Sequence, residues 1–155
     1  MTPLDTSDWS RRQGHRLLQF GVLLFLFALL VGLVVPTFAV PRLGLSTHLL
    51  GLMQGLFLVV LGVLWPRLRV TRMMGRTGAF LAVYGCFAAW TANLSAAMWG
   101  AGNTMLPIAA SASHGSAMQE AIISVALRSA AVSLIAATVM VLWGLRGISS
   151  EESGR

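Results

Sequence analysis

The sequence contains no lysine, a single cysteine and only five acidic residues among its 155 positions. Charged residues make up 10% of the chain, whereas hydrophobic residues make up 56% and the mean hydropathy is +0.77. Soluble domains carry about 25% charged residues, so this composition excludes an ordinary soluble protein. It predicts an integral membrane protein that lies in a lipid bilayer.

The lone cysteine, Cys86, has no second cysteine with which to form a disulfide inside the chain, so it reports nothing about the redox compartment. The chain also lacks a Cys-x-x-Cys-His motif, which excludes covalent attachment of a c-type haem. We expect no cleavable signal peptide, because the first apolar run is too long for one and no small-residue cleavage site follows it.

Four long apolar runs use nearly the whole length and leave no room for a separate soluble domain. A membrane-spanning helix needs about 20 residues, and the runs predict spans at about residues 17–36, 47–65, 77–99 and 119–145. We therefore expect one all-α domain over residues 1–155, an integral membrane four-helix bundle. The polar segment before the first span should be a short, partly disordered tail, and Ser46 or Thr47 is placed to cap the second span.

All eleven basic residues are arginines, and their positions indicate membrane topology rather than nucleic-acid binding. Most of them precede the first span or separate the second from the third: Arg11, Arg12, Arg16, Arg67, Arg69, Arg72 and Arg76. Basic loops mark the cytoplasmic side of a membrane. We therefore expect both termini in the cytoplasm, a location in the bacterial inner membrane, and no nucleic-acid partner.

This topology gathers polar residues from distant parts of the sequence in the outer half of the bundle. His48 begins the second span, Asn93 lies late in the third, Glu120 opens the fourth, and Asn103 and His114 lie in the third loop. Ionisable groups are costly in a bilayer, so their convergence predicts a functional site within an apolar shell. The Gly- and Ala-rich segment 100–118 should be tucked against the bundle or re-entrant.

His48 is the residue on which we centre any chemistry. It is either an axial ligand of haem iron or an interfacial histidine that bonds a carbonyl or a headgroup. A zinc site is disfavoured, since His114 and Glu120 give no recognisable ligand spacing with it. Gly51 and Gly55 form a GxxxG step, which lets either a neighbouring helix or a flat cofactor come close to the backbone.

The other polar residues also keep two interpretations each. Gln54 follows His48 by six residues, so the two side chains point roughly 240° apart and share a ligand only across a groove or between subunits. Gln54 and Asn93 either orient a substrate or tie neighbouring helices together. Glu120 either orients a substrate or complements the helix dipole. Arg128 is turned roughly 80° from Glu120 and is expected to snorkel or to meet another helix.

Three blocks of sequence resemble the small membrane hydroxylaminobenzene mutases. They are residues 48–65, the segment AAWTANLSAAMWGAGNTMLPIAA at residues 88–110, and VLWGLRG at residues 141–147. The resemblance extends over residues 17–147. It implies an isomerase for small aromatic substrates, which moves a hydroxyl group from the nitrogen of an arylhydroxylamine to the ortho ring carbon and gives a 2-aminophenol.

More distantly, the four spans and the amide six residues after His48 are similar to styrene oxide isomerase. That resemblance implies a homotrimer that holds non-covalent haem b between subunits, with a histidine on the iron and the iron acting as a Lewis acid. Where that family has an active-site tyrosine, this chain has Ala92 and Asn93, and where it has an acidic residue, this chain has Tyr84. Because of these differences, epoxide isomerisation is the alternative activity rather than the first. The predicted site residues are His48 as metal ligand, Gly51 and Gly55 beside the cofactor, and Gln54, Asn93 and Glu120 around the substrate.

Two non-enzymatic alternatives remain open at this point. A haem-binding electron carrier normally needs two axial ligands, and the chain offers one good candidate histidine. A structural subunit of a larger membrane complex would need neither haem nor activity. A transporter is disfavoured, because four spans without an evident internal repeat form no obvious path.

Overall fold

The computed structural model describes residues 3–106, 108 and 115–146, and these residues form helices joined by short turns. The long helices are α1 (Pro3–Val34), α2 (Pro41–Leu64), α3 (Arg72–Trp99) and α5 (Ala117–Leu145). Two single 3-10 turns, η1 (Val35–Thr37) and η2 (Trp65–Arg67), follow α1 and α2. Each long helix is apolar and long enough to cross a membrane. The predicted all-α fold with four long apolar helices is therefore confirmed for the described residues, and it is consistent with a membrane four-helix bundle.

The helix ends follow from local sequence. Pro41 occupies the first turn of α2, where the missing N–H of proline costs nothing. The Thr71 side chain caps α3 by accepting from the Met74 N–H, and Gly100 ends that helix in the left-handed conformation with φ 65°. Ser116 and Gln119 form a reciprocal capping box at the start of α5.

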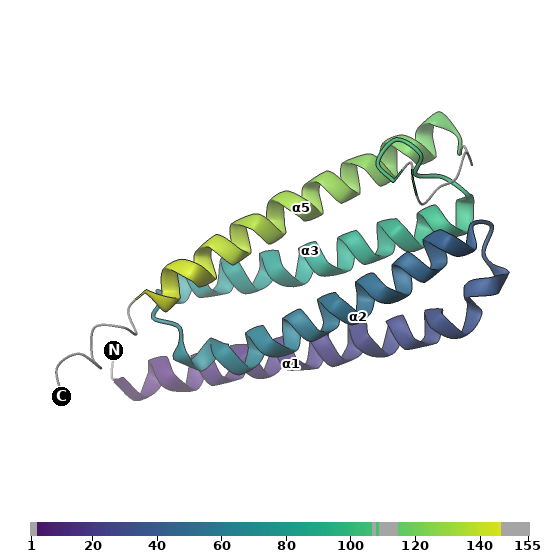
Figure 1. Cartoon of the computed structure of the whole chain (residues 1–155). Coiled ribbons are helices and arrows are strands. Elements are labelled where there is room, and N and C mark those ends of the chain that lie inside the picture. The colour runs from purple at the N-terminus through teal and green to yellow at the C-terminus, as the bar shows by residue number, and fades with distance from the viewer. Residues whose placement is uncertain (1–2, 107, 109–114, 147–155) are drawn as a thin grey trace.

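The helices form two antiparallel pairs, α1 with α2 and α3 with α5, and α2 joins the pairs by packing on α3 (Figure 1). Glycines let α1 and α2 approach closely. A Cβ added at Gly55 would lie 2.9 Å from the Gly21 carbonyl oxygen, and one at Gly62 would lie 2.8 Å from the Gly14 carbonyl oxygen. The two helices therefore touch backbone to backbone, as small residues allow in membrane proteins.

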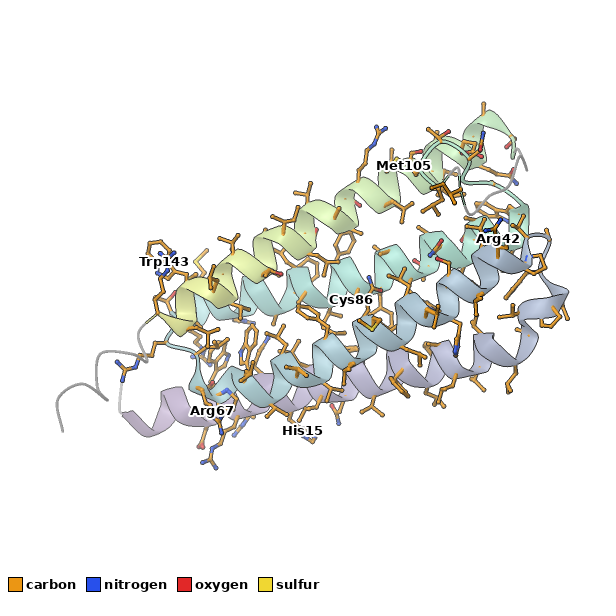
Figure 2. All side chains as sticks on the ribbon, in the orientation of Figure 1. His15, Arg42, Arg67, Cys86, Met105 and Trp143 are labelled. Atoms are coloured by element: carbon orange, nitrogen blue, oxygen red, sulfur yellow. The ribbon has the colours of Figure 1, made fainter. Side chains whose placement is uncertain are left out.

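Large apolar side chains cover the outer faces of the helices, whereas the core is a narrow column between them. Exposed positions include Leu33, Val132, Ile135 and Leu142, and buried ones include Leu24, Leu58 and Trp65. Figure 2 shows Cys86 near the middle of the molecule, with Arg42 towards one end and His15 and Arg67 towards the other. An apolar exterior of this extent is stable in lipid and not in water.

Several predicted boundaries were wrong. The first helix begins at Pro3, so the polar segment that we expected to be a partly disordered tail is helical from that residue. The second helix begins at Pro41, its N-cap is Val40, and Thr47 instead bonds the Leu43 carbonyl within the helix. The helices extend beyond the apolar runs because backbone hydrogen bonding also favours helix in the interfacial region, where charged side chains are tolerated.

The loop after α3 is tucked against the helices as far as the structure describes it. Ala101 and Gly102 are buried, and Ala101 belongs to an apolar cluster with Val40, Leu43 and Ile123. The prediction of a packed apolar loop is therefore confirmed for residues 100–106. His114 lies outside the described residues.

Candidate functional site

His48 points towards α1. It is the eighth residue of α2, about two turns from the helix start, and not in the first turn as we expected. Its Nδ1 lies 2.7 Å from the Ala28 carbonyl oxygen, which can only accept a hydrogen bond. Nδ1 therefore carries the proton in the neutral ring, and the lone pair is on Nε2. The half-buried imidazole therefore bonds a carbonyl, as one of the two interpretations expected, and its role as a ligand of haem iron stays a prediction.

The room for this ring comes from Gly32. A Cβ added at Gly32 would lie 2.6 Å from His48 Nδ1 and 2.8 Å from its Cε1. Any larger residue at position 32 would push the imidazole away from Ala28. Gly32 is thus a positioning residue that the sequence analysis missed, since nothing local distinguishes it from other glycines in a membrane helix.

Gly51 and Gly55 face protein rather than open space. A Cβ at Gly51 would lie 2.6 Å from both Ala28 Cβ and Trp90 Nε1, and one at Gly55 would meet the α1 backbone. Of the two occupants that the GxxxG step suggested, the structure places the neighbouring helices at both glycines. A role of Gly51 and Gly55 in cofactor binding stays a prediction.

A line of polar side chains runs between α2 and α3, and we call it the polar stripe: Ser46, Gln54, Trp90 and Asn93. Asn93 donates from Nδ2 to Ser46 Oγ at 3.4 Å. Trp90 lies next to Gly51, which is about one helical turn before Gln54 on α2. The Trp90 ring stacks on Phe27 of α1, with 5.9 Å between the ring centroids. The stripe therefore joins predicted residues from two helices into one region.

The polar stripe is incompletely hydrogen-bonded. Among the described residues, four buried side-chain atoms have no hydrogen-bond partner, and three of them belong to the stripe: Gln54 Oε1, Trp90 Nε1 and Asn93 Oδ1. Leaving such an atom buried and unpaired costs about 1–3 kcal/mol. Each of these two acceptors and one donor, held in an apolar setting, has the capacity to bond a further polar group.

An apolar groove of about 480 Å³ opens beside the stripe on the outer half of α2. That volume falls within the range of about 300–1,000 Å³ that is usual for small-molecule sites. Ser46 belongs both to the groove and to the stripe, and Arg42 adds a charge at the groove's end. The remaining lining is apolar: Leu45, Leu49, Leu50, Met53 and Ile108. The groove can take an aromatic ring while Ser46 meets a polar substituent.

His48 does not line this groove. Ser46 and His48 are two residues apart on one helix, so their side chains point roughly 160° apart around its axis. The groove and the histidine therefore lie on opposite sides of α2. Within one chain, the structure brings Asn93 to Ser46 and leaves His48 against α1.

Glu120 holds the loop after α3. Its Oε1 accepts the N–H groups of Gly102 at 2.7 Å and Asn103 at 3.1 Å, and its Oε2 accepts the N–H of Thr104 at 3.1 Å. Through these hydrogen bonds the carboxylate has a structural role, because it holds the loop against α5. A catalytic role for Glu120 stays a prediction.

The convergence that the sequence predicted is confirmed for four of its five residues. His48 lies near the start of α2, Asn93 near the end of α3, and Glu120 at the start of α5, where it bonds Asn103. These helix ends lie at the same end of the molecule (Figure 1). Arg128 is exposed on α5, well away from both ends of that helix. Ser46 was missed as a site residue, although its spacing to Leu49, Leu50 and Met53 places all four on one helical face.

A bare metal ion has no ready-made site in the part of the chain that is described, because no group of three or more His, Cys, Asp or Glu side chains comes together there. A metal ion that is part of a larger cofactor can be held by a single protein ligand. His48 alone, with Nδ1 bonded and Nε2 carrying the lone pair, meets the requirement for an axial haem ligand.

The relatives found by comparison with known proteins agree with one another. A family profile described as styrene oxide isomerase matches residues 13–146. Hydroxylaminobenzene mutase HabB of Ectopseudomonas oleovorans is 47% identical over 143 residues, which cover 92% of this chain and 87% of that protein. Hydroxylaminobenzene mutase HabA of the same organism is 35% identical over 125 residues, covering 81% and 93%. No solved structure matches this chain.

Proposed function

The chain belongs to the styrene oxide isomerase family and is an isomerase, and we propose that it rearranges arylhydroxylamines to 2-aminophenols within the membrane. The substrate class follows from the printed names of its two relatives. In this reaction the N–O bond breaks, the oxygen joins the ortho carbon of the same ring, and the ortho hydrogen is transferred to nitrogen. Substrate and product are isomers, so no oxidant or reductant is consumed.

The observation that carries this proposal is the unpaired polar stripe beside an apolar groove. A phenyl ring would lie among the leucines of the groove, with its N-hydroxyl group at Ser46. From there the hydroxyl can donate to Asn93 Oδ1, which is buried without a partner and belongs to the side chain that bonds Ser46. Hydrogen bonds formed to charge that develops during N–O cleavage would favour the transition state over the substrate.

The apolar walls serve a second purpose. Cleavage of the N–O bond leaves an electron-poor ring that bulk water would trap as a different product. The groove is lined almost entirely by apolar side chains and lies in a part of the protein that faces lipid. Exclusion of water would keep the transferred oxygen the substrate's own.

We further propose that His48 holds haem b. Nδ1 is held by the Ala28 carbonyl, Gly32 leaves space for the ring, and Nε2 is the free ligand atom. When bound, haem iron would supply a Lewis acid for the oxygen of the substrate. Because His48 and the groove lie on opposite sides of α2, we also propose a homo-oligomer, a trimer by analogy, in which His48 of one copy serves the groove of another.

The family profile also supports a second activity, the isomerisation of an aryl epoxide to a carbonyl compound. An epoxide oxygen would occupy the same position at Ser46 and Asn93 as the hydroxyl group. The relatives' names favour the arylhydroxylamine, so styrene oxide is the second substrate to test.

The test uses membranes that contain the protein, hydroxylaminobenzene as substrate, and chromatographic detection of 2-aminophenol. The wild-type protein should form the product without taking up label from H₂¹⁸O, because the oxygen moves within one molecule. Asn93→Leu should lower the rate at least about tenfold, the size expected when one hydrogen bond to a transition state is lost. Ser95→Ala on the same helix is the control, since Ser95 bonds only the Thr91 carbonyl of its own helix. Absence of product, or full incorporation of label, would overturn the proposal.

The haem proposal has a separate readout. Visible absorption spectra of oxidised and reduced protein, grown with ample iron and haem, should show a Soret band that is lost in His48→Ala. A band that persists in His48→Ala would place the haem on another residue. If the wild-type protein shows no Soret band, the haem proposal is wrong and the remaining mechanism is metal-free catalysis by the polar residues.

A further inference from the structure

At the arginine-rich end of the molecule, α1 and α3 enclose a groove that the proposed reaction does not use. Three adjoining cavities of about 150, 220 and 370 Å³ share their walls there. The two smaller cavities share Arg12 and Arg72, and the two larger ones share Arg16 and Arg76. We call the whole the basic groove. It lies at the opposite end of the helices from Arg42 and the candidate active site (Figure 2).

The sequence builds this groove from two facing helical stripes. On α1, Arg12 and Arg16 are followed on the same face by Phe20, at steps of four residues. On α3, Arg76 is followed by Phe80 at the same step, after Arg72. Residues four apart are neighbours on a helix surface. Both stripes therefore run from guanidinium groups at the mouth to aromatic rings deeper in the membrane.

The charge at the mouth is not balanced by the side chains that the structure describes. Arg12, Arg16, Arg72 and Arg76 are all exposed, and the described part of the chain gives none of them an ion pair or a hydrogen bond. Among the described residues, Asp8 is the acidic one that lines these cavities. Four guanidinium groups around a single recess repel each other, so an anion between them would relieve that repulsion and accept their hydrogen bonds.

The recess is built by tight packing. Trp9 forms part of the wall between Arg12 and Arg72, and its ring lies directly over Gly75. A Cβ at Gly75 would come within 2.5 Å of Trp9 Cη2, so a glycine is needed for this contact. The indole thereby holds the start of α1 against the first turn of α3 and keeps the four arginines together.

The deeper part of the groove is apolar and can take the first carbons of a lipid tail. It is lined by Leu17, Phe20, Ala79, Phe80 and Val83. The whole groove rises about 16 Å along α3 from Arg72 to Val83, close to half of a hydrocarbon core of about 30 Å, and its apolar part from Ala79 to Val83 accounts for about 6 Å of that. A ligand that fits the whole groove has an anionic headgroup joined to an apolar chain that runs towards the bilayer centre.

We propose that the basic groove is a binding site for one anionic phospholipid, whose phosphate lies among the four arginines and whose acyl chain lies between Phe20 and Phe80. Arginine forms paired hydrogen bonds with phosphate oxygens. Basic recesses between transmembrane helices are a recurring way to bind anionic headgroups. The site ties together the ends of α1 and α3, which otherwise pack mainly on other helices.

The test measures the thermal midpoint of delipidated protein in a neutral detergent, titrated with phosphatidylglycerol, phosphatidylcholine or soluble glycerol 3-phosphate. Phosphatidylglycerol should raise the midpoint in a saturable way, and phosphatidylcholine should not. Arg72→Gln/Arg76→Gln should weaken the apparent affinity for phosphatidylglycerol on the order of tenfold, since two guanidinium groups leave the headgroup.

The matched control is Arg11→Gln/Arg67→Gln, which removes the same charge at the same end of the molecule but from residues outside the cavity walls. Its affinity for phosphatidylglycerol should stay close to that of the wild-type protein. Equal weakening in both double variants would show general surface attraction and overturn the proposal. So would an equal response to glycerol 3-phosphate, which would indicate a site for free phosphate, or no response to phosphatidylglycerol in the wild-type protein.

Discussion

Replacing Gly32 by alanine tests whether the orientation of His48 matters for the reaction. The added Cβ would lie 2.6 Å from His48 Nδ1, whereas ordinary contacts begin at 3.4 Å. The difference, 3.4 − 2.6, means that the ring must move by about 0.8 Å, or α1 must move by the same amount. Such a shift would stretch the 2.7 Å bond to Ala28 to as much as about 3.5 Å, where it no longer counts as a hydrogen bond.

Two costs follow from this displacement. The lost hydrogen bond is worth about 1 kcal/mol net, and overpacking a filled site costs about 1–3 kcal/mol more. Stability should therefore fall by roughly 2–4 kcal/mol. Activity should fall further than stability alone explains, because losing the partner that orients a catalytic or ligating histidine typically costs about 10–100-fold.

The assay compares the rate of 2-aminophenol formation with the thermal midpoint in detergent for three proteins. Gly78→Ala is the matched control, because a Cβ there meets nothing nearer than Met140 Sδ at 3.6 Å. It should keep the wild-type rate and gain a little stability from the better helix propensity of alanine. His48→Ala sets the lower limit of activity. If folded Gly32→Ala protein turned over substrate as fast as Gly78→Ala, the orientation of His48 by Ala28 would have no part in the reaction.

Three further predictions address the stripe, the loop and the packing. Gln54→Leu removes a buried atom without a partner, so the thermal midpoint should hold or rise while 2-aminophenol formation falls about tenfold; a normal rate would take Gln54 out of the site. Glu120→Gln should lower the thermal midpoint and speed protease cleavage in segment 100–116, because each loop N–H that loses its charged acceptor costs about 1 kcal/mol. Unchanged cleavage would contradict the role of Glu120 in holding this loop to α5. Gly55→Leu should reduce the yield of folded protein in size-exclusion chromatography, since even its Cβ would lie 2.9 Å from the Gly21 carbonyl, whereas normal yield would show that α1 can move aside.

Hydropathy and length were enough to predict the class of protein and the number of long helices. These properties depend on each segment's own transfer to lipid and its own backbone hydrogen bonds, so they can be inferred segment by segment. The antiparallel order of four spans then put His48, Asn93 and Glu120 in the same half of the molecule, as the structure confirms. The starts of the helices were misjudged, because a helix continues past its apolar run into the interface.

The neighbours of each side chain were decided only by tertiary structure. The sequence predicts the angle at which Ser46, His48 and Gln54 leave α2, but not which helix lies in each direction. The backbone contact that Gly21 and Gly55 permit places α1 on the side of His48, and the packing of α2 on α3 brings Asn93 to Ser46. The rotation and pairing of the helices are set by the sum of many small packing contacts, and they decide that α1 covers the histidine while α3 brings Asn93 to Ser46.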